Sequence, residues 1–189
     1  MKKLFLSFVF ALLGTFSFAQ NTWNIDQMHS SVNFTVQHMG ISFVQGRFDK
    51  FIGNLTTKGN SLDNASFDIN IHPESINTGV EMRDNHLKSK EFFAADEYSE
   101  IKFTGATITK EKDGSYVCNG KLTIKDVTKE ISVPVVLGGI TKNKEGKEIM
   151  GLQAKFSISR FDYGLNYDPT AIGIAKHVDI NVYLELVKR

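Results

Sequence analysis

The stretch ASFDINIH, residues 65–72, alternates strictly between apolar and polar side chains. A period of two places Ala65, Phe67, Ile69 and Ile71 on one face of an extended strand and the polar residues on the other. Strands with one apolar and one polar face are typical of antiparallel sheets, because parallel strands are usually apolar on both faces. This stretch therefore predicts an antiparallel sheet with one face toward a core and the other toward water.

The same alternation recurs in four further stretches, at residues 31–37, 116–124, 150–158 and 178–186. Together with less regular segments, they predict strands at 23–26, 30–38, 43–57, 64–72, 100–109, 115–125, 130–138, 149–159 and 176–187. Strands of about ten residues are longer than usual and extend roughly 30 Å. The sequence therefore predicts an all-β protein. If about eight such strands close into a barrel, they enclose a narrow tube with space for side chains or one small ligand.

The apolar positions of these strands share one phase, so we expect them to line the inside of the tube. The residues assigned to this lining are Phe34, Val36, Phe67, Ile69, Phe103, Leu122, Phe156, Ile158, Ile180 and Val182. Cys118 lies on the apolar side of its strand and, as the single cysteine, has no partner for an internal disulfide. We interpret it as a small buried hydrophobic residue.

Several residues interrupt the alternation. Gly46, Gly53 and Gly105 fall inside strands, where an isolated glycine usually marks a bulge or a sharp bend. Pro134 has no amide donor, so its strand must be irregular there if the sheet closes. Residues 111–114 and 143–146 have the composition of hairpin turns.

One segment lacks the alternation and carries good helix formers instead. Thr78 and Glu81 have the spacing of a capping box, with Thr78 as the N-cap. We therefore predict one short, charged helix over residues 79–90, inserted between two groups of strands.

The first 19 residues differ from the rest. Lys2 and Lys3 precede an apolar run, and Ser17-Phe18-Ala19 offers small residues at a cleavage site, which is the pattern of a secretory signal peptide. We expect cleavage after Ala19 and a periplasmic or secreted protein. Cleavage leaves 189 − 19 = 170 residues, 20–189, as one domain with 22 − 2 = 20 basic and 21 acidic side chains. A chain so close to neutral gives no indication of nucleic-acid binding.

The sequence contains no nucleophile elbow, phosphate-binding loop or paired-cysteine zinc spacing. Its five histidines lie at predicted strand ends or on the predicted helix, at His29, His38, His72, His86 and His177. None has a second His or Cys at helical ligand spacing. We predict no catalytic residues, no metal site and no cofactor, with a metal site assembled across strands left open as an alternative.

Two short charged segments allow two interpretations. Arg83-Asp84 and Arg160-Phe161-Asp162 are either ion pairs that fasten the helix and a loop to the sheet, or parts of the tube's mouth that contact a polar headgroup. The candidate rim residues are His29, His38, Arg83, Asp84, His86, Arg160 and Tyr163.

Motifs spread over nearly all of residues 20–189 resemble the YceI-like (polyisoprenoid-binding) family. They are Trp23-Asn24-Ile25-Asp26, His29-Ser30, Phe34, His38, Gly46-Arg47-Phe48, the segment from Arg83 to Ser89 with Phe92-Phe93, Ile101-Lys102-Phe103, the segment from Gly120 to Lys125, and the segment from Arg160 to Gly164. The chain departs from the family pattern at two turns, where Ser99 and Glu100 replace a common proline and Asp126 replaces a usual glycine.

The resemblance implies an extended lipocalin-like barrel of eight antiparallel strands, one helix between strands, and a homodimer. It also implies a bound isoprenoid or similar lipid, such as a prenyl quinone or a polyprenyl phosphate, with its tail inside the tube. We therefore expect a carrier, not an enzyme, that stores or transports this lipid and makes transient contact with membranes. The alternative is an enzyme acting on such a lipid, with His29, His38 or His86 as general base.

Overall fold

The computed structural model describes residues 20–189, and the predicted signal peptide, residues 1–19, lies outside the described residues. The strands are β1 (Gln20–Ile25), β2 (Ser31–His38), β3 (Ser42–Phe48), β4 (Phe51–Lys58), β5 (Ser61–Ile71), β6 (Ile76–Asn77), β7 (Ile101–Lys110), β8 (Tyr116–Ile124), β9 (Val127–Lys142), β10 (Glu148–Ser159) and β11 (Ile174–Lys188). The helical elements are α1 (Glu81–Lys88) and two 3-10 helices, η1 (Pro73–Ser75) and η2 (Arg160–Tyr163). Within residues 20–189, no helix is long and apolar enough to cross a membrane.

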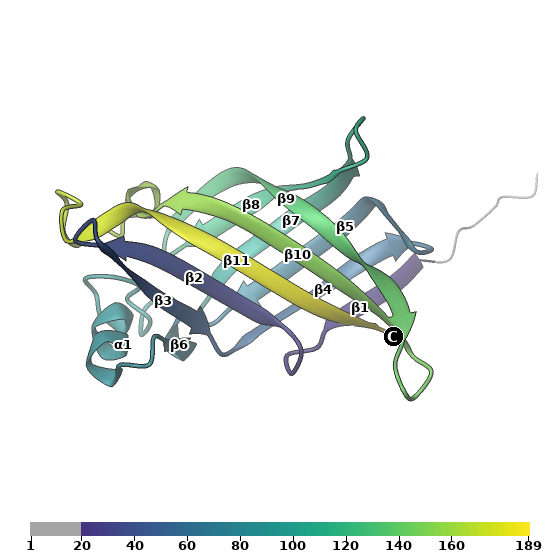
Figure 1. Ribbon diagram of the computed structural model, residues 1–189, viewed down its shortest axis with the longest axis horizontal. Helices are drawn as coiled ribbons and strands as arrows, with labels where there is room; N and C mark the ends of the chain where they lie inside the picture. The colour runs from purple at the N-terminus through teal and green to yellow at the C-terminus, as the bar shows by residue number, and fades with distance from the viewer. Residues whose placement is uncertain (1–19) are drawn as a thin grey trace, which may run out of the picture.

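The strands form one antiparallel sheet in the order β1-β4-β5-β7-β8-β9-β10-β11-β2-β3-β6. Because β1 also pairs with β11, the eight strands from β1 to β11 in this order close into a barrel (Figure 1). β2, β3 and β6 continue the sheet beyond β11, toward the end of the barrel where α1 lies. The structure confirms the predicted all-β class and the extended, lipocalin-like eight-stranded barrel with an inserted helix.

The two ends of the barrel are filled differently. Near the β1–β11 pairing the interior is packed solid, and Trp23, Leu55, Leu62, Met150 and Leu186 are fully buried there. Toward α1, many inward-facing side chains are only partly buried although they pack against the same core, among them Phe34, Phe67, Phe156, Ile158 and Val182. The apolar side chains therefore fill one end of the barrel and leave space at the other.

The prediction of a single strand over residues 43–57 is wrong. The strand is interrupted at Asp49 and Lys50, which separate β3 from β4. The backbone N–H of Asp49 donates to the carbonyl of Ser75 at 3.0 Å, and the carbonyl of Lys50 accepts from His72 N–H at 2.9 Å. These bonds to the η1 segment turn the chain from the β2–β3 ladder to the ladders that β4 makes with β1 and β5.

The predicted capping box is also wrong. α1 begins at Glu81 with Val80 as its N-cap, and it ends at Lys88 instead of residue 90. Thr78 serves a different purpose, since its backbone N–H and its hydroxyl both donate to Asp84 Oδ1, at 2.8 and 2.5 Å. Gly79, with φ of 77°, turns the chain between Thr78 and the helix.

Both predicted hairpin turns are confirmed, and so is the predicted bulge at Gly105. In the turns, Gly114 N–H donates to the carbonyl of Glu111, and Gly146 N–H donates to that of Asn143. Gly105 has a φ of 60° and lies at a register shift in the β7–β8 ladder.

Pro134 lies in β9 just beyond the end of the β9–β10 ladder. It pairs with Val117 in the β8–β9 ladder, which shows no register shift. The β9–β10 ladder ends at Val135, the residue that directly follows the proline in the sequence. The missing amide donor therefore falls where β10 no longer pairs with β9.

Gly46 and Gly53, in contrast to the prediction, lie at regular ladder positions and not at a bulge, since the register shift of the β4–β5 ladder falls between Thr56 and Lys58. Both positions need glycine, because neighbouring atoms leave no space for a Cβ. A Cβ on Gly46 would collide with the Phe34 ring, and one on Gly53 would lie 2.5 Å from the backbone oxygen of Asp68 and 3.1 Å from Ile69 Cα.

We expect Gly53→Ala to destabilise the protein by about 1–3 kcal/mol, because the new Cβ meets backbone, which cannot rotate away. Asn54→Ala, at the next and exposed position of β4, should change the free energy of unfolding by less than about 0.5 kcal/mol. Urea denaturation of both variants measures the difference, and equal losses would contradict the close-packing explanation.

Candidate functional site

The open part of the barrel is a cavity of about 210 Å³. All ten residues that the alternation assigned to the lining lie on its wall. Among residues 20–189, the polar residues on the wall are Gln153 and Arg160, and Gln153 is exposed on the outer side of β10. The remainder of the wall among the described residues is apolar, so the cavity suits a hydrocarbon.

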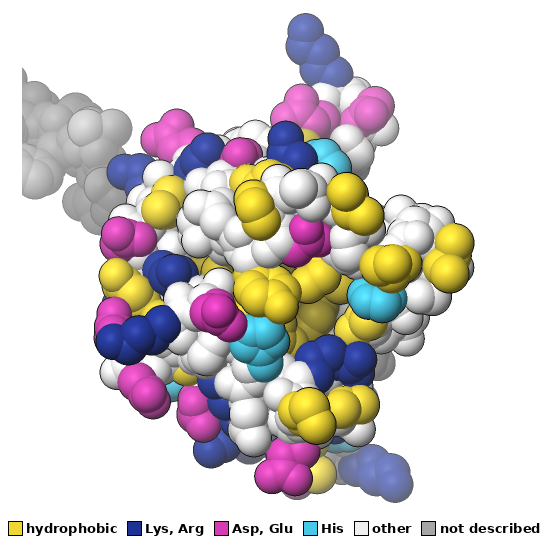
Figure 2. All heavy atoms as spheres, turned by 90° about the vertical axis from the view of Figure 1, so that its left-hand side faces the viewer, with side chains coloured by type: hydrophobic (Ala, Val, Ile, Leu, Met, Phe, Trp, Pro, Cys, Tyr) yellow, Lys and Arg dark blue, Asp and Glu magenta, His cyan; other side chains and the backbone are white. Residues whose placement is uncertain are grey.

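The cavity is closed at one end and open at the other. The fully buried side chains near the β1–β11 pairing, such as Trp23 and Met150, fill the barrel beyond the closed end of the cavity, and we call this packed end the floor. Toward α1 its wall includes Leu87, Phe92, Phe93, Leu165 and Ile174, and we call this end the mouth. Figure 2 looks onto this end and shows hydrophobic side chains around an opening and deeper inside it. The site is therefore a blind tube.

Aromatic rings form a large part of the wall near the mouth. The Phe48 ring lies 5.8 Å from Phe34 and 5.8 Å from Phe93, centroid to centroid, and it meets the Phe93 ring edge to face. Farther along, the rings of Phe67 and Phe103 are 6.4 Å apart. Such tilted and edge-to-face pairs are favourable arrangements for packed aromatic rings. Phe48 and Phe93 were not assigned to the lining: Phe93 lies outside the predicted strands, and Phe48 fell inside the predicted strand over residues 43–57, which lacks the strict alternation.

The helical segment and the β10–β11 loop meet over the mouth. The His86 ring is 4.8 Å from the Tyr167 ring and 5.0 Å from Phe92, and Phe92 is 4.9 Å from Tyr167. His86 Nε2 also lies 2.6 Å from Glu91 Oε2. The structure thus places His86 at the mouth, with an imidazole that is partly exposed.

Arg160 is the most deeply buried charge of the described residues, with an exposed fraction of 3%. Its guanidinium donates five hydrogen bonds of 2.6–3.0 Å, all to backbone carbonyls, which belong to Leu165, Tyr167, Asp168, Ile174 and Ala175. Burial lowers the pKa of Arg160, and the nearby Asp168 partly opposes this shift. The side chain therefore organises the β10–β11 loop, and its donors are already in use.

The ion pairs considered for the two charged segments do not form. The nearest cation to Asp162 is Lys129, at 3.6 Å, and not Arg160. Arg83 donates to Thr78 instead of pairing with Asp84, through Nε to the hydroxyl at 2.7 Å and through Nη2 to the carbonyl at 2.9 Å. Since Thr78 in turn donates to Asp84, the three residues form one local network at the start of α1.

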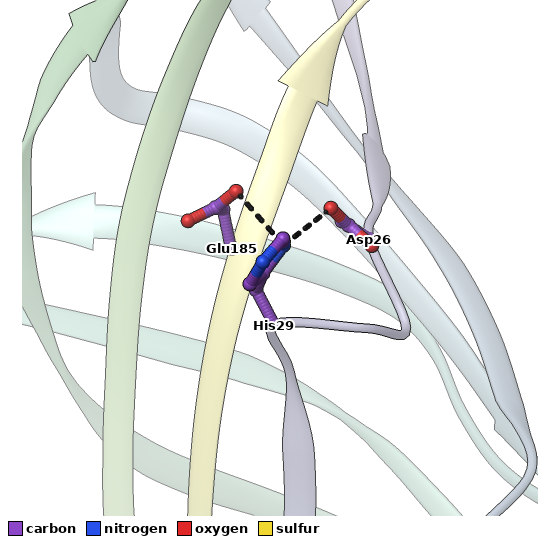
Figure 3. A group of neighbouring side chains, drawn as sticks. All are labelled: Asp26, His29 and Glu185. Atoms are coloured by element: carbon purple, nitrogen blue, oxygen red, sulfur yellow. Dashed lines mark hydrogen bonds and ion pairs between the residues drawn. The ribbon is translucent and has the colours of Figure 1, made fainter. Parts of the chain in front are cut away.

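His29 lies beside Asp26 and Glu185 (Figure 3) and away from the other rim candidates. It precedes β2, whereas His38 ends β2 at the mouth, and a strand of eight residues is about 26 Å long. Its Nδ1 lies 2.8 Å from Asp26 Oδ2 and 3.5 Å from Glu185 Oε1. These three residues could together hold a metal ion, since their ligand atoms lie within 4.8 Å of one another. The same geometry is also that of an ion pair that fastens the β1–β2 loop to β11.

Tyr163 and Cys118 are buried. Burial raises the pKa of Tyr163, which lies in η2 below the loop. Burial also raises the pKa of Cys118 to about 12, and its side chain lines the cavity. The structure confirms that Cys118 is a buried, apolar-facing residue.

Comparisons with known proteins agree with this architecture. A family model described as the YceI-like domain matches residues 23–186. A UPF0312 protein of Staphylococcus aureus is 36% identical over 147 residues, which is 77% of this chain and 83% of that protein. The YceI protein of Campylobacter jejuni superposes with a TM-score of 0.69 at 29% identity, over 81% of this chain and 90% of that one.

Two more distant structures show the same fold. BcnA of Burkholderia cenocepacia has a TM-score of 0.74 at 21% identity, over 85% of this chain and 98% of its own. A polyisoprenoid-binding domain from Saccharophagus degradans has a TM-score of 0.69 at 17% identity, over 88% of this chain and 98% of its own.

We expect Arg160→Gln to lower the free energy of unfolding by at least about 2 kcal/mol, because it leaves several carbonyls without their donor. Amide exchange in residues 165–175 should become faster. Arg47→Gln is the matched control, since Arg47 is an exposed arginine paired with Asp49, and it should cost less than about 1 kcal/mol. Arg160→Gln with unchanged stability and exchange would contradict the organising role.

The hydrogen bond to Asp26, followed by the charges of Asp26 and Glu185, raises the pKa of His29 above its ordinary value of 6.5. The contact therefore contributes fully below about pH 6.5 and is lost as the pH rises through the higher folded-state pKa. An NMR titration should show a midpoint above 6.5 for His29, and a lower one in Asp26→Asn. Glu185→Gln should lower it less. Equal midpoints in wild type and Asp26→Asn would exclude this ion pair.

Proposed function

Because this chain belongs to the YceI-like family, we propose that it binds one long, apolar lipid of the isoprenoid type, with the tail in the barrel cavity and the polar end at the mouth. The observation that carries the proposal is the blind cavity, whose wall is apolar apart from Arg160 and the outward-facing Gln153. A wall of this kind offers no partner for a polar solute. It buries methyl and methylene groups without leaving donors or acceptors unsatisfied.

The shape of the cavity favours an extended chain over a compact ligand. Wall residues follow β11 from Ile174 to Leu184, a length of roughly 30 Å along the strand. The likeness to a polyisoprenoid-binding domain from Saccharophagus degradans supports the same class of ligand. A prenyl quinone and a polyprenyl phosphate both have such a tail.

The energetics fit a carrier that exchanges its ligand. Burial of a lipid tail gains roughly 0.8 kcal/mol per methylene relative to water, but a bilayer offers a similar gain. A smooth apolar wall therefore matches the membrane instead of outcompeting it, so that the protein can load and unload. We extend the proposal to storage or transport of the lipid outside the cytoplasm, by a protein released from its signal peptide.

The headgroup would lie between α1 and the β10–β11 loop. His86 and Tyr167 are partly exposed at the mouth, and Arg83 is close by on α1. Arg160 is less suited, because its donors are already bound to backbone carbonyls. His38, at the mouth end of β2, completes the candidates for this role.

One observation favours an enzyme as the second candidate. His86 and Glu91 form a close pair at the mouth, where a lipid headgroup would arrive. A histidine oriented by a carboxylate is a common general base. Incubation of the protein with prenyl lipids, followed by mass spectrometry, decides between the two. A product with a new mass that disappears in His86→Ala would establish the enzyme, and unchanged lipid in both proteins would support the carrier.

We expect Phe67→Trp and Phe156→Trp each to lower ligand occupancy severalfold, because both rings line the cavity and a larger ring narrows it. Tyr183→Trp makes a similar change on the outer face of β11 and serves as the control. Delipidated protein is incubated with a prenyl quinone, and bound quinone is extracted and quantified by mass spectrometry. Melting temperatures show that the variants fold. Equal occupancy in all three variants would mean that the two rings belong to a solid core and that the proposal fails.

A further inference from the structure

Two loop tips lie side by side at the mouth. One is residues 39–46, which form the β2–β3 turn and most of β3, and the other is residues 169–175, which lead into β11. They are joined by a hydrogen bond of 2.9 Å from Met39 N–H to the carbonyl of Gly173. Figure 1 shows the two tips together at the end of the barrel where α1 lies. Neither stretch contains a charged residue. We call them the docking tips.

Both docking tips carry large apolar side chains that are exposed to solvent. The exposed fractions are 87% for Ile41, 70% for Ile172, 64% for Phe43 and 55% for Met39. Single exposed apolar side chains are ordinary on protein surfaces, but a group of them at one place marks an interaction site. The same end of the molecule also exposes Met82 on α1.

The β2–β3 turn carries an apolar residue against local preference. Met39 and Gly40 both have positive φ, 52° and 73°, and Ile41 N–H donates to the carbonyl of His38 at 3.1 Å. Asn-Gly is the favoured pair in such turns, because asparagine tolerates this backbone region better than methionine does. An exposed methionine held in this conformation at the tip of the hairpin points to a function for the side chain.

The charges around the docking tips fit a lipid surface. Asp168, the acidic residue at the edge of the second tip, turns its carboxylate inward and accepts from Thr170 Oγ1 and from the N–H groups of Gly173 and Ile174. These bonds lower the pKa of Asp168. On the other side, the exposed Lys176 follows the tip directly. The apolar tips are thus flanked by a cation, with the neighbouring anion withdrawn into its own loop.

We propose that the docking tips insert into the surface of a lipid bilayer and hold the mouth of the cavity against it. Ile174, in one of the tips, lines the cavity, so the tip that exposes Ile172 also contributes to the cavity wall. Separate protruding side chains suit a fluid apolar medium, whereas a protein partner would need a matching pocket for each. This inference rests on the proposed function, since it gives a membrane lipid a path that avoids water.

The contact is shallow and reversible. Four side chains on two tips reach the boundary between headgroups and acyl chains, as in other proteins bound at the membrane surface. The attraction is mainly apolar, because residues 20–189 carry 20 basic and 21 acidic side chains. Binding should therefore occur on zwitterionic vesicles and change little with salt.

The test measures co-flotation of the purified protein with phosphatidylcholine vesicles. The variant Ile41→Ser/Ile172→Ser should lower the vesicle-bound fraction at least about tenfold. Ile52→Ser is the matched control, since Ile52 is an exposed isoleucine on β4 and away from the mouth, and it should bind like wild type. Wild-type binding that is absent, equal in the double variant, or equally lost in Ile52→Ser would overturn the proposal.

Two further measurements separate this inference from the proposed function and from self-association. Prenyl quinone added from ethanol should load the double variant as fully as wild type, while extraction of the same quinone from vesicles should slow at least about tenfold. Failure of wild type to load from ethanol would refute the proposed function and leave the flotation result to decide the docking. A wild-type molar mass in solution that falls in the double variant would show that the tips bind a second copy, and would overturn membrane docking.

Discussion

The pairing of β1 with β11 is the contact on which the remainder of the structure depends. It joins Trp23 to Lys188, Asn24 to Val187 and Ile25 to Leu186, and so closes the eight strands from β1 to β11 into a barrel. Trp23 is anchored there, because its Nε1 donates to Thr57 Oγ1 at 3.0 Å and Lys188 lies over its ring. Lys188 also pairs with Glu148 at 2.6 Å. Closure at this end allows the barrel interior to pack without a cavity, and this packed floor holds the strands in place around the hollow part of the barrel.

The opposite end is held by polar contacts in addition to apolar packing. A buried cation usually needs a carboxylate, and the removal of its partner is strongly destabilising. Arg160 instead satisfies its five donors with five carbonyl dipoles, three from the loop that follows it and two from the start of β11. This arrangement lets a loop without regular structure keep one conformation beside an empty space. The mouth can therefore remain open without collapse of its border, which a purely hydrophobic loop would not achieve.

Much of the barrel could be predicted from the sequence, because the period of two is a local property of each strand. That period identified the long strands and ten residues of the cavity wall. It could not identify the break at Asp49 and Lys50, which depends on hydrogen bonds to residues 72–75. Nor could it identify the carbonyl partners of Arg160, since every residue has a backbone carbonyl and the sequence does not show which of them a side chain reaches. The mouth residues Leu165 and Ile174 were missed because they lie in or beside a loop without periodicity. Local patterns thus predicted the tube, and long-range polar contacts decided its ends.

The position of Cys118 has a consequence for the redox chemistry of the protein. Its thiol faces the cavity, with a pKa raised to about 12. At neutral pH the thiol therefore stays protonated, whereas the thiolate is the species that reacts with disulfides and oxidants. A single accessible cysteine can cross-link chains or form mixed disulfides. Here the same apolar wall that accepts hydrocarbon keeps the sulfur protonated, so the chain carries a thiol that stays chemically silent.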